Sequence, residues 1–231
     1  MSMPMSMPTS MPPSMPPSML DLDRFRATPL QHDPFDFLCV PGFVKRDHLE
    51  ALHRDYPKVD KPGSIPLGVF PQGPAFDSLI AELRGEAVCR AFSEKFGLDL
   101  SRYPTMFTAR GMCRATDGKI HPDSASKIVT VLIYMNPPWE ASGGRLRVLR
   151  RPDLEVYAVE VPPDEGTLLC FRRCDTSWHG HHSFEGRRRA VQMNWVRNSV
   201  YIWHEQWRHR VGAWVKNRVG ARPGRSLGGL G

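Results

Sequence analysis

The feature that most constrains the fold is a series of short apolar segments between about residues 105 and 198, each closed by a turn signal. The densest of them, Lys127 to Asn136, is rich in β-branched residues and predicts a strand buried on both faces. Further strands are predicted at 107–115, 144–149, 155–161, 167–171 and 189–196. This series favours a mainly β fold of the double-sheet jelly-roll kind.

The segment before this series predicts one strand and two helices. The apolar segment 35–44 predicts the strand, which ends at Pro41-Gly42. Asp47 is the expected N-cap of the first helix, which Pro57 ends, and Asp77 that of the second, which Gly97 ends. We expect these flanking helices to pack on one outer face of the sheets.

Composition divides the chain of 231 residues into three parts. Residues 1–19 are a Met/Pro/Ser repeat and are predicted to be disordered. Residues 20–200 form the predicted domain, and 201–231 a basic C-terminal helix and tail. Such a tail could touch nucleic acid or an anionic membrane, but a solvated end is the simpler expectation. We therefore expect no clear nucleic-acid or membrane partner, and the sequence sets no oligomeric state.

The cysteines and the apolar segments indicate the compartment. The five cysteines are odd in number and form no Cys-x-x-Cys pair, which argues against a disulfide framework or a zinc ribbon. No segment approaches the roughly 20 apolar residues that span a bilayer, and the start lacks the pattern of a secretory signal. The expectation is a cytoplasmic protein.

A His-Pro-Asp motif predicts a metal site. His121 and Asp123 are two positions apart, so an extended backbone directs both side chains to the same face. His179 would supply a third ligand, with His181 and His182 as rivals, while Asp123 could instead cap a turn. Two imidazoles and one carboxylate hold a redox-active iron and leave coordination positions open.

Several landmarks occur in a recognisable order. They are His121-Pro122-Asp123, the strand at 127–136, Ser142-Gly143-Gly144, Glu165-Gly166-Thr167, Trp178-His179-Gly180 and the three arginines after Gly186. Over about residues 36–196 this set resembles bacterial Fe(II)- and 2-oxoglutarate-dependent oxygenases of the prolyl-4-hydroxylase-like type. The resemblance implies a double-stranded β-helix, a jelly-roll variant. It also implies Fe(II), the cosubstrate 2-oxoglutarate and O2, with ascorbate as an optional reductant.

The resemblance also implies roles for individual residues. His121, Asp123 and His179 would be the catalytic iron ligands. Arg189, ten positions after His179, would pair with the distal carboxylate of 2-oxoglutarate, since guanidinium binds carboxylate through two parallel hydrogen bonds. Arg188 is the competing anchor. Strand alternation favours Arg189, because we expect the face that it shares with residues 191, 193 and 195 to line the barrel.

Two residues of the strand at 127–136 would complete the cosubstrate site. Tyr134 matches a tyrosine whose hydroxyl binds 2-oxoglutarate in the family, and Thr130 on the same strand face is a second candidate. The expected reaction converts 2-oxoglutarate and O2 to succinate and CO2 and hydroxylates a small molecule, such as a sugar, an amino acid or a natural-product intermediate. Asp123 favours hydroxylation, since halogenating relatives carry a small residue there.

Three alternatives stay open at this point. The same chemistry could act on prolyl or other protein side chains, or the chain could be a non-catalytic jelly-roll binding protein. An adaptor that works through the basic tail is a third. Four arginines between residues 145 and 151 could attract an anionic substrate or could simply cover an exposed strand face.

Overall fold

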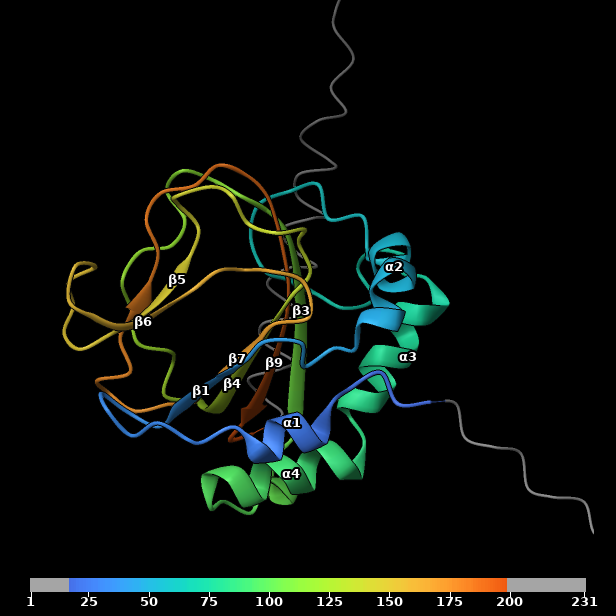
Figure 1. Cartoon of the computed structure of the whole chain (residues 1–231), viewed down its shortest axis with the longest axis horizontal. Helices are drawn as coiled ribbons and strands as arrows, with labels where there is room; N and C mark the ends of the chain where they lie inside the picture. The colour runs from blue at the N-terminus through green and yellow to red at the C-terminus, as the bar shows by residue number, and fades with distance from the viewer. Residues whose placement is uncertain (1–16, 199–231) are drawn as a thin grey trace, which may run out of the picture.

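Two antiparallel β-sheets face each other in the computed structural model of the chain, which describes residues 17–198 (Figure 1). The larger sheet contains β1 (Phe37–Val40), β2 (Ile65–Pro66), β3 (Thr105–Cys113), β4 (Lys127–Tyr134), β7 (Leu168–Arg172) and β9 (Gly186–Val196). Their order across the sheet is β1-β7-β4-β9-β3-β2. The smaller sheet contains β5 (Leu146–Leu149), β6 (Tyr157–Val161) and β8 (His179–Gly180), in the order β6-β5-β8. The predicted jelly-roll architecture is confirmed.

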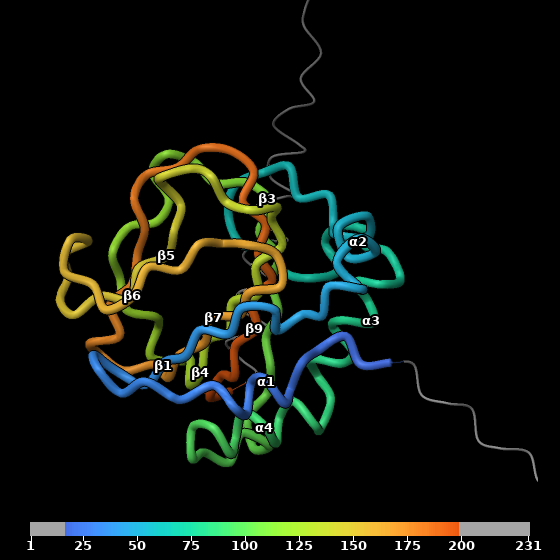
Figure 2. Tube along the Cα trace, in the orientation of Figure 1, coloured from blue at the N-terminus to red at the C-terminus, as the bar shows by residue number. Residues whose placement is uncertain are grey.

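The helices cover the larger sheet on the side away from β5 and β6. They are α1 (Leu22–Ala27), α2 (Arg46–Asp55), α3 (Pro74–Leu83), α4 (Glu86–Phe96) and the 3-10 turn η1 (Leu100–Arg102). Figure 2 shows α1 and α4 along one side of this sheet and α2 and α3 beside β3. The expected packing of the helices on one outer face is therefore confirmed.

Alternation along β4 and β9 separates two apolar clusters. Val129, Val131 and Ile133 of β4, with Val191 and Met193 of β9, pack against the helices in the main core. The intervening positions face the space between the two sheets, because successive side chains of a strand point to opposite faces. Aromatic residues of β1, β4 and β7 fill part of that space together with β5 and β6. The remainder of the space holds the candidate site.

The helix boundaries differ from the predicted ones at two points. Lys45 precedes α2 as its N-cap residue, and Asp47 lies inside the first turn, so the predicted cap is wrong. The predicted helix from Asp77 to Gly97 is two helices that meet at Arg84 and Gly85. Gly97 ends α4 with φ of 62°, a left-handed conformation that glycine adopts readily, which confirms the predicted stop.

The carboxylate of Asp55 links the end of α2 to the start of α3. Its Oδ2 accepts a hydrogen bond of 2.8 Å from the backbone N–H of Ala75 in the first turn of α3. A helix N-terminus has unpaired N–H groups and favours negative charge. This backbone hydrogen bond lowers the pKa of Asp55 below its ordinary value, against the opposing effect of desolvation.

Six of the predicted strands are present with shifted ends, as β3 to β7 and β9, and the segment at 35–44 contributes β1. The two-residue strands β2 and β8 were not predicted. Ser18 and Met19, assigned to the disordered repeat, are described and bonded to Glu82. Residues 1–16 and 199–231, with the rest of that repeat and the predicted C-terminal helix, lie outside the described residues. Within 17–198, none of the helices has the length and apolar character needed to cross a bilayer.

Candidate metal centre and cosubstrate pocket

A short backbone bridge brings the two histidines of the motif set together. His121 lies in the loop between β3 and β4, and His179 begins β8. The N–H of each residue donates to the carbonyl of the other at 3.1 Å, and the two ring centroids lie 4.5 Å apart. This antiparallel pair fixes both imidazoles on one face of the bridge before any ligand is bound.

Hydrogen bonds at Nδ1 set the tautomer of both rings. Nδ1 of His121 lies 2.7 Å from the carbonyl oxygen of Lys119, and Nδ1 of His179 lies 3.0 Å from that of Ser177. A carbonyl can only accept, so Nδ1 carries the proton in each ring. Nε2 of each ring therefore has a free lone pair that can coordinate a metal ion. A backbone carbonyl bonded to Nδ1 in this way orients a metal-binding histidine.

The carboxylate of Asp123 completes the cluster. Among residues 17–198, His121, Asp123 and His179 form a group whose ligand atoms lie within 4.8 Å of one another. Two imidazole nitrogens and one carboxylate are the ligand set of non-haem Fe(II) oxygenases, so the donors fit the iron that the motifs imply. The sequence predicted that these three residues would lie close together, and the structure places them together.

Electrostatics keep these donors in the state that binds metal. Burial tends to raise the pKa of Asp123, but Lys127, His179 and Thr130 outweigh it and lower that pKa. Burial lowers the pKa of His179 to about 4, although Asp123 opposes this effect. Near neutral pH the site therefore offers an ionised carboxylate and a neutral imidazole.

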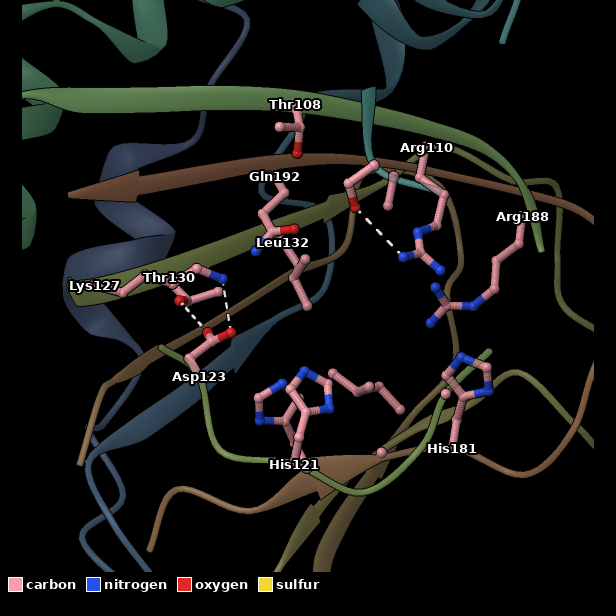
Figure 3. A pocket seen from close by; sticks show the side chains of 16 residues that line it. Thr108, Arg110, His121, Asp123, Lys127, Thr130, Leu132, His181, Arg188 and Gln192 are labelled. Atoms are coloured by element: carbon pink, nitrogen blue, oxygen red, sulfur yellow. Dashed lines mark hydrogen bonds and ion pairs between the residues drawn. The ribbon is translucent and has the colours of Figure 1, made fainter. Parts of the chain in front are cut away.

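Two neighbours hold the carboxylate of Asp123 in place. Nζ of Lys127 lies 2.7 Å from Oδ1, and the hydroxyl of Thr130 donates to Oδ2 at 2.5 Å (Figure 3). Lys127, the first residue of β4, is almost buried. Thr130 was a candidate for binding 2-oxoglutarate. Its hydroxyl instead bonds to Asp123 and Asn194, so its contact is with a candidate metal ligand.

The cluster forms one end of a cavity of about 250 Å³ between the sheets. Figure 3 shows Asp123 and Lys127 on one side of this cavity and the guanidinium groups of Arg110 and Arg188 on the other. Thr108, Leu132 and Gln192 line the wall between these two sides. On the β7 side, the ring of Phe171 lies 4.9 Å from that of His179.

Arg188 and Tyr134 each carry a buried polar atom that the described residues leave without a well-formed hydrogen bond. Nε of Arg188 donates to the carbonyl of Gly144 at 2.8 Å, but neither Nη2 of Arg188 nor the hydroxyl of Tyr134 makes a well-formed hydrogen bond within residues 17–198. The guanidinium carbon lies 5.3 Å from the centroid of the tyrosine ring. Burial raises the pKa of Tyr134, which keeps the hydroxyl protonated as a donor. Two buried donors without acceptors fit the distal carboxylate of a keto acid.

The expectation that the face of Arg189 lines the barrel is wrong. Arg188, Ala190 and Gln192 line the cavity, whereas Val191 and its odd-numbered neighbours on β9 pack under the helices. Arg189 points to the helix side, where Nη1 lies 3.4 Å from the carbonyl of His53. The physical reason is the strand alternation itself, since the apolar side of β9 covers the core and the polar side faces the cavity.

The rival histidines His181 and His182 do not belong to the metal-binding group of the described residues. His181 lines the cavity but belongs to no metal-binding group of the described residues, and its Nδ1 lies 2.8 Å from the carbonyl of His182. Burial lowers the pKa of His181 to about 4. The ring packs directly on Gly118, where an added Cβ would lie 2.3 Å from Cε1 and φ is +85°. Glycine is required at this contact.

Sequence reasoning did not assign Arg110 or Gln192, which line the cavity from β3 and β9. The signal that could have identified them is the same alternation, because each is a polar residue among apolar neighbours in a predicted strand.

Comparison with known proteins gives a family match over part of the chain. Residues 112–197 match the family described as the 2OG-Fe(II) oxygenase superfamily, and this segment contains every residue of the metal cluster. No curated protein matches the sequence. The match covers the part of the chain that holds the metal cluster, and it supports an enzyme that uses Fe(II), 2-oxoglutarate and O2.

Solved structures agree with this class at the level of the fold. A prolyl-4-hydroxylase from Pseudomonas putida is 17% identical with a TM-score of 0.51, covering 77% of this chain and 93% of that one. A 2OG-Fe(II) oxygenase family oxidoreductase from Burkholderia pseudomallei is 16% identical with a TM-score of 0.50, covering 80% and 94%. A prolyl 4-hydroxylase from Phytophthora capsici is 16% identical with a TM-score of 0.51, covering 80% and 68%. The resemblance inferred from the motifs is confirmed.

Proposed function

We propose that this oxygenase hydroxylates a small molecule, with Fe(II) held by His121, Asp123 and His179 and 2-oxoglutarate anchored by Arg188 and Tyr134. The observation that carries the proposal is the convergence of three donor atoms within 4.8 Å at one end of a cavity whose opposite wall contains Arg188, whose buried Nη2 makes no well-formed hydrogen bond within residues 17–198. We also propose that residues 20–200 are the catalytic domain and that the protein is cytoplasmic, which its five free cysteines support.

Bound Fe(II) would supply the oxidative decarboxylation of 2-oxoglutarate by O2 to succinate and CO2, with hydroxylation of a substrate C–H bond. The protein residues orient the groups that take part. Nε2 of each histidine would bind the metal, because Nδ1 lies against a backbone carbonyl. Lys127 and Thr130 fix the orientation of the Asp123 carboxylate. Arg188 and Tyr134 would bind the far end of the keto acid, and the ring of Phe171 packs beside that of His179 on the β7 side.

The size of the cavity favours a small substrate. About 250 Å³ must hold the keto acid as well as the reacting part of the substrate, which is little space by the standard of ligand sites. The prolyl hydroxylases among the structural neighbours make a peptidyl proline the second candidate. Stimulation of succinate formation by a proline-rich peptide, but not by small molecules, would favour the second candidate.

The test is succinate formation by the purified full-length protein with Fe(II), 2-oxoglutarate and O2, with and without ascorbate. We expect slow uncoupled turnover that a chelator abolishes. The substitution Asp123→Gly should abolish turnover and reduce Mn(II) affinity by more than the roughly 10–100-fold typical of losing an outer-shell partner. The control Asp175→Gly removes an exposed carboxylate that does not line the cavity and should change neither quantity.

Circular dichroism of both variants checks that they fold. Full turnover or unchanged Mn(II) affinity of the Asp123→Gly variant would show that Asp123 is not a ligand. Absence of succinate with correctly metallated wild-type protein would refute the proposed reaction.

A further inference from the structure

The cavity has a second cationic side chain that the proposed cosubstrate site leaves unused. Arg110 extends from β3, and its guanidinium group points toward the same region as that of Arg188, on the side away from Asp123 (Figure 3). Its side chain is 27% exposed, whereas the Arg188 residue is 5% exposed. Arg110 is therefore the more accessible of the two groups.

The register of the strands places Arg110 beside the cosubstrate site. Ala190 of β9 pairs with Tyr134 of β4 on one side and with Arg110 of β3 on the other. Tyr134 and Arg110 are thus two strands apart, about 10 Å, on the same face of the sheet. The next row contains Leu132, Gln192 and Thr108 in the same order.

The polar residues of these rows lie on the β3 side. Thr108 and Gln192 line the cavity there, and Ser64 comes from the segment before the edge strand β2. The opposite side is closed by apolar side chains of β1 and β7, including Phe171. A substrate that enters from the β2 and β3 side meets Arg110 before it reaches the metal ligands.

Arg110 is weakly engaged by the protein. Nη2 lies 3.4 Å from the hydroxyl of Ser64, and Nη1 lies 3.5 Å from Oδ2 of Asp117. Nη1 also lies 4.0 Å from Sγ of Cys113. These contacts are long for charge-assisted hydrogen bonds, which usually measure about 2.7–2.9 Å. Much of the hydrogen-bonding capacity of the guanidinium therefore remains for a ligand.

The charge balance of the cavity favours an anion. Its lining contains three cationic side chains, Arg110, Lys127 and Arg188, and one carboxylate, Asp123. A divalent iron and the doubly negative keto acid cancel each other, so they leave this excess in place. Asp117, outside the lining, offsets only part of it. An anionic group on the substrate would complete the balance.

The arginines between residues 145 and 151 do not perform this task. Arg147 donates to Glu160 at 2.6 Å, and Arg145 donates to the carbonyls of Trp139 and Ala141. Neither lines the cavity.

We propose that Arg110 binds an oxyanion, a carboxylate or phosphate group, of the small-molecule substrate, so that the substrate lies over Thr108 and Gln192 with its reacting carbon toward the metal ligands. This inference rests on the proposed function, since it concerns the substrate of the same site. The planar guanidinium suits either oxyanion through two parallel hydrogen bonds.

The test uses full-length protein loaded with Zn(II) and saturated with 2-oxoglutarate, which fills the cosubstrate site without turnover. Inorganic phosphate and acetate are titrated separately by calorimetry, with potassium chloride keeping the ionic strength constant. We expect at least one of these anions to bind, and the stronger of the two indicates whether the substrate carries phosphate or carboxylate. Arg110→Gln should weaken this binding by about tenfold or more while the affinity for 2-oxoglutarate stays within about twofold.

Two further variants make the result specific. Arg114→Gln is the matched control, because Arg114 also pairs with Asp117 but does not line the cavity, and it should bind the anions as the wild type does. Arg110→Lys keeps the positive charge but loses the pair of parallel hydrogen bonds, so it should retain part of the anion binding. This variant also provides a test if the Arg110→Gln variant does not fold.

Three outcomes would overturn the proposal. They are no anion binding by the wild type at tens of millimolar, equal binding by the wild type and the Arg110→Gln variant, and loss of 2-oxoglutarate affinity in that variant, which would assign Arg110 to the cosubstrate. Failure of the proposed function is a separate result, because it is the absence of succinate from the iron-loaded wild type.

Discussion

The two adjacent arginines of β9 provide the sharpest test of the cosubstrate site. Arg188 faces the cavity and Arg189 faces the helices, so replacement by methionine should weaken 2-oxoglutarate binding at Arg188 and leave it unchanged at Arg189. Methionine keeps much of the apolar length of arginine and removes the charge. The Arg188→Met substitution deletes the buried donor Nη2 that has no partner within residues 17–198.

The expected magnitude follows from the lost hydrogen bonds. A hydrogen bond to a charged group contributes about 1.5–3 kcal/mol, so loss of a carboxylate contact should raise the dissociation constant of 2-oxoglutarate about 10- to 100-fold. Arg188 also donates to the carbonyl of Gly144, so a moderate loss of stability should accompany the change. The Arg189→Met variant should leave the affinity within about twofold.

Calorimetric titration of Mn(II)-loaded protein with 2-oxoglutarate under nitrogen measures the affinity, and urea unfolding measures the stability. The KM for 2-oxoglutarate in the succinate assay should rise in parallel with the dissociation constant. A large loss of affinity in the Arg189→Met variant, with normal affinity in the Arg188→Met variant, would refute the assignment made from strand alternation.

Three other substitutions test features that support the site. Thr130→Val removes the hydroxyl that orients Asp123 and should weaken Mn(II) binding about tenfold, as measured by calorimetry. Gly118→Ala places a methyl group against His181 at positive φ and should lower the free energy of unfolding by about 1–3 kcal/mol in urea titrations. Asp55 has a lowered pKa, so its carboxylate stabilises the fold above the unfolded-state pKa, and this contribution is lost as the pH falls through the lower folded-state value. The stability advantage of wild type over the Asp55→Asn variant should therefore be present at pH 6 and shrink below about pH 4 in urea titrations; an advantage that grows with acidity would contradict this reasoning.

Local sequence patterns were sufficient to predict most of the fold. The density of β-branched residues in β4 and the turn pairs around it predicted the sheet, and Gly97 predicted a helix end. The break between α3 and α4 was missed, because apolar residues continue at helical spacing on both sides of Gly85. The strands β2 and β8 have two residues each, too few for any periodicity to be visible.

The candidate site was also predicted only in part. The spacing of His121, Asp123 and His179 predicted a cluster that the structure contains. The choice of Arg189 over Arg188 failed because the odd-numbered face of β9, which we expected to line the barrel, packs under the helices. The residues that follow the two arginines indicate the correct face, since the apolar side chains at the odd positions of β9 belong to the core. Alternation could have marked Arg110 as a cavity residue, but its place beside the cosubstrate site depends on the register of β3 with β9, which the sequence does not give.

The mutual backbone pairing of His121 and His179 has a consequence for metal capture. Two segments that are far apart in sequence are already joined by a pair of amide hydrogen bonds, and their imidazoles are already oriented by carbonyl groups. Much of the conformational entropy needed to assemble a coordination sphere has therefore been lost during folding, so an incoming ion has little left to organise.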